Sequence, residues 1–96
     1  MSKFMDFPIL YGKMGNHPGN LTTPQAIALF KAAMSCPVGS QFIEYWPDYG
    51  RSTIILGHAA RNLDGSLAVY TNWQDAPPLS QLWFERGLKT HKLTSL

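Results

Sequence analysis

Residues 41–73 read QFIEYWPDYGRSTIILGHAARNLDGSLAVYTNW, and this stretch contains three runs rich in β-forming side chains. The runs are residues 41–46, 52–59 and 66–73, and the turn formers Pro-Asp-Tyr-Gly and Asn-Leu-Asp-Gly separate them. Asp-Gly between two apolar runs is a strong hairpin signal. Links this short favour strands that lie side by side. The stretch therefore predicts a three-stranded antiparallel meander over residues 41–73.

One helix is predicted before this sheet in the sequence and another after it. Thr23 fits an N-cap with Pro24 at the first helical position, and residues 24–36 are rich in helix-compatible side chains. Asp75 and the two prolines after Ala76 open a second helix over residues 76–87, which a glycine ends.

The two ends of the chain complete the expected fold. Pro8 interrupts an aromatic-rich start, so residues 1–20 are predicted to be an extended arm followed by a Gly-rich loop. Residues 88–96 are predicted to be a basic tail. The expected fold class is α+β in a single domain over residues 1–96: an N-terminal extended arm, a helix, the antiparallel meander, and a C-terminal helix packed on one face of the sheet.

Length and composition exclude several classes of protein. The chain has 96 residues, of which 45% are hydrophobic and 15% charged, which is unlike an intrinsically disordered chain. No apolar stretch approaches the roughly 20 residues that span a bilayer, so no membrane association is expected. A single cysteine cannot form an internal disulfide, and this favours a cytoplasmic location.

Positive charge is concentrated at the C-terminus. Residues 1–85 hold five basic and six acidic side chains, whereas residues 86–96 hold Arg86, Lys89 and Lys92 and no acid. These three side chains are candidates for contact with a nucleic acid or an acidic partner. The alternative is a solvated helix end that the helix dipole favours.

Metal, cofactor and nucleophile chemistry find little support in the sequence. Cys36, His17, His58 and His91 do not share the close spacing of a structural metal site. Cys36 stands at the end of a predicted helix, where the dipole disfavours a thiolate. The loop at residues 12–20 matches neither the Walker A nor the dinucleotide-binding pattern. No metal and no cofactor are therefore expected.

One pair of residues could perform acid–base chemistry. Glu44 lies among aromatic residues in the first predicted strand, and His58 lies in the second. A carboxyl group buried there would have a raised pKa, so a small enzyme with a Glu44 and His58 pair is the third functional hypothesis.

Aromatic side chains are the most informative feature. The chain has three Trp, four Tyr and five Phe, and several stand at predicted strand ends, where they could form a platform for a protein partner. Two polar residues of the Gly-rich loop, Lys13 and His17, are expected to be exposed and to take part in binding. The predicted partner-binding residues are Trp46, Tyr49, Trp73, Tyr45, Lys13 and His17.

The leading hypothesis is a small non-enzymatic module that docks on a larger protein or protein complex and modulates or inhibits it. Small accessory proteins of bacteria and phages, including inhibitors of host defence or DNA-processing enzymes, share this profile as a class. A nucleoprotein complex is a further candidate partner. The alternative hypothesis is a nucleic-acid-binding accessory protein. The chain has seven prolines, and a native cis bond before any of them would make folding slow. A prolyl isomerase is then a candidate partner, and Trp46–Pro47 is the first bond to examine for the cis form.

Overall fold

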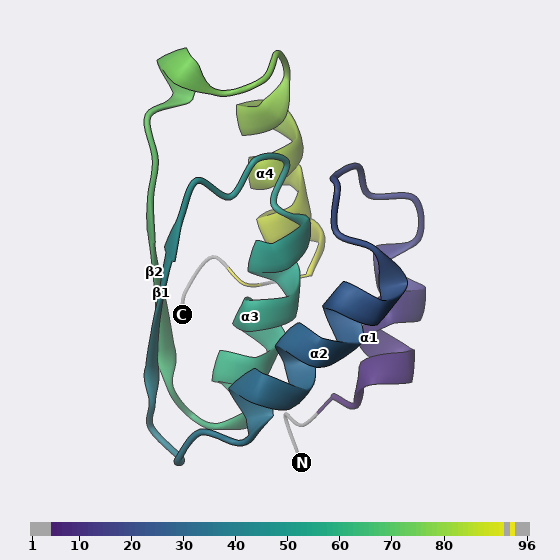
Figure 1. The fold of residues 1–96 in the computed structure, drawn as a ribbon, viewed down its shortest axis with the longest axis vertical. Coiled ribbons are helices and arrows are strands. Elements are labelled where there is room, and N and C mark those ends of the chain that lie inside the picture. Colours follow the sequence, from purple (N-terminus) through teal and green to yellow (C-terminus); the bar gives the residue numbers. More distant parts are fainter. Residues whose placement is uncertain (1–4, 92, 94–96) are drawn as a thin grey trace.

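Four α-helices and a two-stranded parallel sheet form the chain in a computed structural model that describes residues 5–91 and 93 (Figure 1). The elements in order are α1 (Phe7–Met14), α2 (Thr23–Met34), β1 (Gln41–Tyr45), α3 (Arg51–Asn62), β2 (Ser66–Tyr70), a 3-10 turn η1 (Trp73–Asp75) and α4 (Ser80–Thr90). The fold is mixed α/β, and the prediction of a three-stranded antiparallel meander was wrong.

The segment expected to be the central strand is the helix α3. Gly50, at φ +93°, turns the chain into this helix, and seven of its twelve residues are buried. A helix buried on several sides is apolar all round, so its sequence resembles that of a central strand. The Asn-Leu-Asp-Gly segment follows the helix and leads into β2 instead of forming a hairpin, with Asp64 at φ +53°. Because α3 crosses between them, β1 and β2 run parallel, with Gln41 opposite Ser66 and Tyr45 opposite Tyr70.

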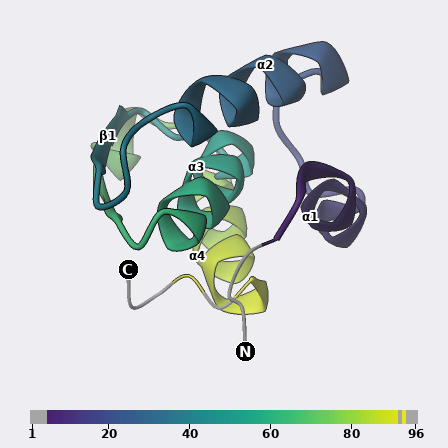
Figure 2. The ribbon, with the colours of Figure 1, turned by 90° about the horizontal axis from the view of Figure 1, so that it is seen from below.

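Helix α3 is the centre of the packing. It contacts the other three helices and both strands. Helices α2, α3 and α4 lie on one side of the sheet, and α1 lies on their far side (Figure 2). The core cluster consists of Leu10, Met14, Ala26, Phe30, Ala33, Ile54, Ile55 and Ala59.

The predicted N-terminal arm contains a helix. Asp6 caps α1, because its carboxylate accepts a hydrogen bond of 2.8 Å from the backbone N–H of Phe7. Pro8 stands in the first turn, where a helix loses no internal donor. Leu10 and Met14 are buried, so this helix contributes to the core.

The helix expected over residues 24–36 is α2, and it begins one residue earlier. Thr22, not Thr23, is the N-cap, and it forms a capping box with Gln25. Its hydroxyl accepts from the Gln25 N–H, and the Gln25 side chain accepts from the Thr22 N–H.

The helix expected over residues 76–87 is α4, which begins at Ser80 and continues through Gly87 to Thr90. Gly87 is needed for close packing and does not end the helix, since a Cβ there would lie 2.8 Å from Cε1 of His17. The first three residues of the predicted basic tail, 88–90, are therefore helical.

Two further expectations concern prolines and membranes. Peptide bonds in the described part of the chain are all trans, including Trp46–Pro47, so the condition for naming a prolyl isomerase is not met there. Among the helices of residues 5–91 and 93, none is long and apolar enough to cross a bilayer.

Candidate functional site

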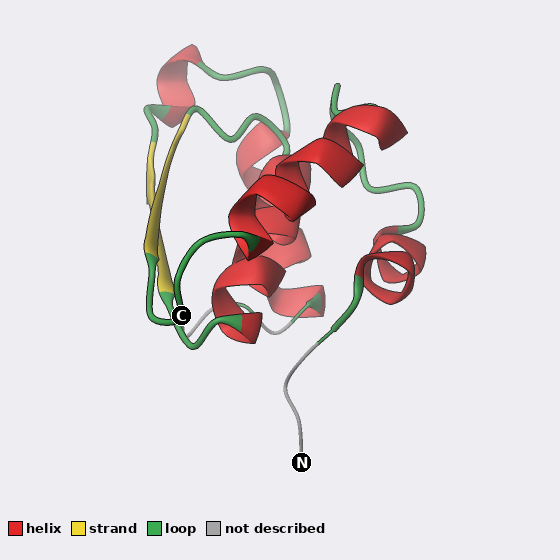
Figure 3. Ribbon diagram, turned by 60° about the horizontal axis from the view of Figure 1, so that its bottom comes forward, coloured by secondary structure: helices red, strands yellow, loops and turns green. Residues whose placement is uncertain are grey.

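The helices lie on one side of the sheet (Figure 3), and the opposite face of the sheet exposes apolar side chains. The parallel register places Ile43 beside Ala68 and Tyr45 beside Tyr70 on this face. Ile43, Tyr45 and Tyr70 are 54%, 65% and 55% exposed. The rings of Tyr45 and Tyr70 stack, with their centroids 5.5 Å apart and an interplanar angle of 25°. Parallel sheets are normally covered on both faces, so this face is unusual in being open to solvent.

We call this surface the outer sheet face and define it by its six residues, Gln41, Ile43, Tyr45, Ser66, Ala68 and Tyr70. Trp46 continues the strand pairing by one residue, because its N–H donates to the Tyr70 carbonyl at 3.1 Å. Its side chain is 57% exposed. An exposed indole therefore stands next to the stacked tyrosines at the end of this face.

Charge is unevenly distributed around the outer sheet face. None of its six side chains is charged, and no Lys or Arg stands between residues 32 and 50 or between residues 62 and 85. Asp48 follows the C-terminal end of β1, and Asp75 follows that of β2. Since the strands are parallel, both ends lie at the same edge of the sheet. An uncharged surface thus has acidic residues next to its tyrosine end.

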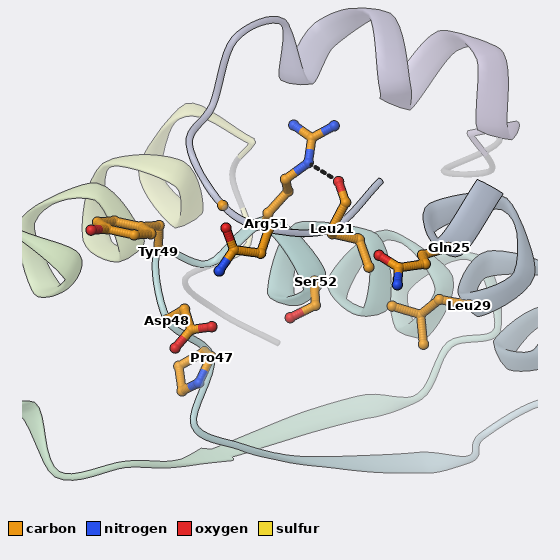
Figure 4. Close-up of a pocket in the computed structure, with 10 residues that line it drawn as sticks. Leu21, Gln25, Leu29, Pro47, Asp48, Tyr49, Arg51 and Ser52 are labelled. Carbon is orange, nitrogen blue, oxygen red and sulfur yellow. Dashed lines mark hydrogen bonds between the residues drawn. The ribbon is translucent and has the colours of Figure 1, made fainter. Parts of the chain in front are cut away.

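The turn between β1 and α3 is conformationally strained. Trp46 and Asp48 have φ values of +57° and +54°, which non-glycine residues adopt at a cost, and Gly50 follows at +93°. The turn forms one wall of a cavity of about 430 Å³ that the loop before α2 also lines (Figure 4). Strain of this kind is concentrated at functional and tightly packed sites.

Glu44 points from the inner face of β1 to the start of α3. Its carboxylate accepts hydrogen bonds from the hydroxyls of Ser52 and Thr53, the second of them 2.5 Å long. Burial raises the pKa of Glu44, the two hydroxyl bonds oppose the rise, and the Asp48 carboxylate adds to it. Glu44 therefore ties the strand to the helix, and its donors come from the Ser-Thr pair that opens α3.

Arg51 lines this cavity, and its guanidinium donates hydrogen bonds to the Gly-rich loop. Its Nε donates to the Leu21 carbonyl at 2.9 Å, the bond drawn in Figure 4. Its Nη1 donates to the His17 carbonyl at 3.0 Å, and its Nη2 to the Tyr11 hydroxyl at 2.7 Å. These contacts assign Arg51 a structural role.

The structure does not bring Glu44 and His58 together. Glu44 contacts the first turn of α3, and His58 lies six residues after Ser52, about 9 Å further along the helix axis. His58 Nε2 instead lies 3.0 Å from Nδ1 of His91. The expectation of an acid–base pair assumed neighbouring strands, whereas His58 is in a helix.

The predicted partner-binding residues fall into different parts of the molecule. Tyr45 is on the outer sheet face, with Trp46 beside it, whereas Tyr49 and Trp73 are half-buried. Trp73 lies beyond β2 in η1 and packs against the Phe84 ring at 5.1 Å.

The two loop residues of that set lie on the α1 side, away from the sheet. Lys13 is exposed near the end of α1. His17 is half-buried, because its Nε2–H donates to the Tyr49 carbonyl at 2.7 Å and its ring meets the Trp83 ring edge-on at 5.7 Å. The expectation that His17 is an exposed polar group was wrong.

The predicted basic contacts lie on α4. The Arg86 guanidinium stands over the Trp83 ring, 5.0 Å from its centroid, and Lys89 is exposed in the last turn. Lys92 lies outside the described residues.

Sequence reasoning missed Ile43 and Tyr70 as surface residues and His91 as the partner of His58. The outer sheet face can be assigned only once the pairing of β1 with β2 is known to be parallel. Nothing in the sequence links His58 to a residue 33 positions away.

Comparisons with known proteins do not assign this chain to a family. No protein-family model matches it, and no curated protein matches it. Within the part of the chain that the structure describes, no three His, Cys, Asp or Glu side chains are grouped so that they could hold a metal ion.

Proposed function

We propose that this chain is a non-enzymatic binding module that docks on a larger cytoplasmic protein through the outer sheet face and thereby modulates or inhibits it. The observation that supports this most directly is the stacked pair of Tyr45 and Tyr70 on the open face of a parallel sheet. Exposed tyrosines supply large contact areas at low entropic cost, and they are enriched at protein interfaces.

The charge distribution indicates the chemistry of the partner. The outer sheet face has no charged side chain, and Asp48 and Asp75 lie beyond its tyrosine end. A complementary surface has an apolar centre with lysine or arginine side chains on the matching side of its rim. The same acidic residues disfavour an approach by nucleic-acid phosphates to this face.

A capture experiment with matched variants tests this proposal. The tagged protein is incubated with a lysate of the cells that produce it, with and without nuclease, and retained proteins are quantified by mass spectrometry. The test variant is Ile43→Ser with Tyr70→Ser, on the outer sheet face. The control is Ile9→Ser with Leu82→Ser, which replaces side chains that are 58% and 53% exposed on α1 and α4.

We expect a nuclease-resistant protein partner that the control retains and the outer-face variant loses, while circular dichroism shows both variants folded. Binding of the purified partner, weakened at least about tenfold by the outer-face variant, would complete the test. Retention of the partner by the folded outer-face variant would contradict the proposal. A dimer of the protein alone that the same variant dissociates would show that a second copy covers this face.

A nucleic-acid-binding accessory protein is the second candidate. It is supported by Arg86 and Lys89, two exposed cations on α4. Nuclease-sensitive retention and a steep loss of affinity with added salt would favour this function.

A further inference from the structure

Helices α1, α3 and α4 enclose a second region with unusual chemistry, far from the outer sheet face. A cleft of about 270 Å³ opens between them and is lined by Met5, Lys13, His58, Arg61, Thr90 and His91. A neighbouring cleft of about 280 Å³ shares three of these residues, and its other lining residues include several from the Gly-rich loop and from α4. The shared residues are Lys13, Thr90 and His91.

The floor of the first cleft is a buried histidine pair. His58 and His91 are 1% and 7% exposed, and His58 Nε2 lies 3.0 Å from His91 Nδ1. His58 Nδ1 is buried without a hydrogen-bond partner. Proteins rarely bury an N–H that has no acceptor. The favoured tautomer therefore leaves His58 Nδ1 as a lone pair and has His58 Nε2–H donate to His91.

This tautomer determines what His91 offers to a ligand. Its Nδ1 accepts from His58, so its Nε2 carries the proton of the neutral ring. His91 lines both clefts. Its Nε2–H is therefore a donor with which a bound acceptor could pair.

Positive charge surrounds the pair. No Asp or Glu is among the residues that line either cleft. Arg61 is held at the first cleft by a bond of 3.0 Å from its Nη2 to the His91 carbonyl. Lys13 is exposed and has no hydrogen bond or ion pair with any other residue that the structure describes.

Burial and the positive charge around the pair lower the pKa of both histidines. Burial lowers the pKa of His58 to about 4, and the charges of His91, Arg61 and Lys13 add to the effect. Burial also lowers the pKa of His91, and His17, Lys13 and Arg61 lower it further. These neighbouring charged groups are all positive when protonated, so they would attract an anion to this cleft.

We propose that this cleft binds a phosphate group, as inorganic phosphate or as the phosphate of a small phosphomonoester. Lys13 and Arg61 supply the opposing charges, and His91 Nε2–H and the Thr90 hydroxyl supply neutral donors. A tetrahedral oxyanion has several acceptor oxygens and matches such a convergent set of donors, among which arginine is especially suited to phosphate.

The surroundings favour a small ligand over a nucleic-acid strand. Single strands bind where bases can stack on open aromatic faces. Besides His17, the aromatic side chain that lines the adjacent cleft is Trp83. The Arg86 guanidinium stands over the Trp83 ring, and the His17 ring meets it edge-on. The described lining of the clefts therefore supplies several donors to a phosphate, whereas the indole that it offers to a base already contacts Arg86 and His17.

Histidine NMR resonances provide a direct test. The protein is titrated with inorganic phosphate at constant ionic strength, with chloride as the balancing anion. We expect saturable shifts of the His58 and His91 ring protons. We also expect an increase in the pKa of His91 with phosphate bound, because the bound anion offsets the positive charges that lower it.

Matched lysine variants make the test specific. Lys13→Gln is expected to weaken phosphate binding at least about tenfold, the loss of one charge-assisted bond. Lys31→Gln, at an exposed lysine on α2, is the control and should leave the affinity unchanged. Arg61→Gln should also weaken phosphate binding. Lys13 is the better test, because it is exposed and has no hydrogen bond or ion pair to lose among the described residues.

Three results would overturn the proposal. One is the absence of saturable shifts of the two histidines. Another is an equal effect of Lys13→Gln and Lys31→Gln, which would indicate non-specific attraction. The third is a short oligodeoxythymidylate that binds more tightly than phosphate and independently of Lys13. None of these results depends on the outer sheet face, so this site and the proposed docking function can fail separately.

Discussion

His58 and His91 join the middle of α3 to the end of α4 through one hydrogen bond of 3.0 Å between buried rings. Their rings meet nearly at right angles, with centroids 5.1 Å apart. Leu93 closes over α3 one residue before His58, where a Cβ on Gly57 would lie 2.8 Å from Leu93 Cδ1. The end of α4 is therefore packed against the central helix and contributes to the core.

The buried histidine pair makes folding stability dependent on pH. The unfolded chain protonates His58 as the pH falls below about 6.5, whereas the folded chain does so only near pH 4. The free energy of unfolding should therefore be highest above pH 6.5 and decrease as the pH falls towards 4, by an amount on the order of 2 kcal/mol. Urea denaturation followed by circular dichroism from pH 7.5 to 4.5 measures this.

His58→Gln is the matched variant for this prediction. Glutamine keeps an amide donor in the core and does not titrate, so the variant should be less stable at neutral pH and should lose less stability on acidification. His91, whose pKa is also lowered, will retain part of the slope. An undiminished slope in His58→Gln would show that other groups cause the pH dependence.

Arg51 should contribute strongly to the free energy of unfolding. Its guanidinium holds the Leu21 and His17 carbonyls and the Tyr11 hydroxyl at once, and lysine cannot reproduce this geometry. We expect Arg51→Lys to lower the free energy of unfolding by roughly 3 kcal/mol or more, the value of two lost charge-assisted bonds. Hydrogen exchange should also become faster in residues 15–21.

Arg86→Lys is the control for that experiment. Arg86 is exposed and stands over Trp83, where lysine can also place a positive charge. A change well below 1 kcal/mol is expected, as for most surface positions. If both variants lost the same free energy of unfolding, the hydrogen bonds of the Arg51 guanidinium would not explain its effect.

Parts of this fold could be predicted from the sequence because local signals agreed with the tertiary structure. Helix α2 has a proline in its first turn and a run of helix formers, and α4 follows two prolines. The first and third β-rich runs are strands in the structure, as β1 and β2.

The rest failed for identifiable reasons. Ile54 and Ile55 are β-formers, but they are in the most buried helix, where tertiary packing overrides propensity. Gly50 at positive φ starts that helix without a side-chain cap, so the usual N-terminal signal is absent. With residues 52–59 taken as a strand, short links on either side favour an antiparallel sheet, and the outer sheet face cannot be found.

The outer sheet face should contribute little to the stability of the monomer. Tyr45 and Tyr70 are more than half exposed and contact each other rather than the core. We expect Tyr45→Thr with Tyr70→Thr to lower the free energy of unfolding by about 1 kcal/mol or less, the value of an aromatic cross-strand pair. Thermal denaturation measures this, and a loss of several kcal/mol would show that the two rings are part of the core.

Gly65 and Gly12 give the sharpest contrast between two substitutions of the same kind. A Cβ at Gly65 would lie 2.0 Å from the Ser40 carbonyl oxygen, a backbone atom next to the start of β1. The next residue, Ser66, donates its backbone N–H to the same Ser40 oxygen at 3.1 Å. Gly65→Ala must therefore separate the beginnings of the two strands, and we expect a loss of roughly 3 kcal/mol or more.

Gly12 lies within α1 and has no atom within 4 Å of an added Cβ. Gly12→Ala should therefore raise the free energy of unfolding by about 0.5–1 kcal/mol, because alanine loses less backbone entropy in a helix. Chemical denaturation of both variants at pH 7.5 tests the pair. If Gly65→Ala were as stable as the parent protein, the close approach of β2 to Ser40, and with it the parallel register of the sheet, would be wrong.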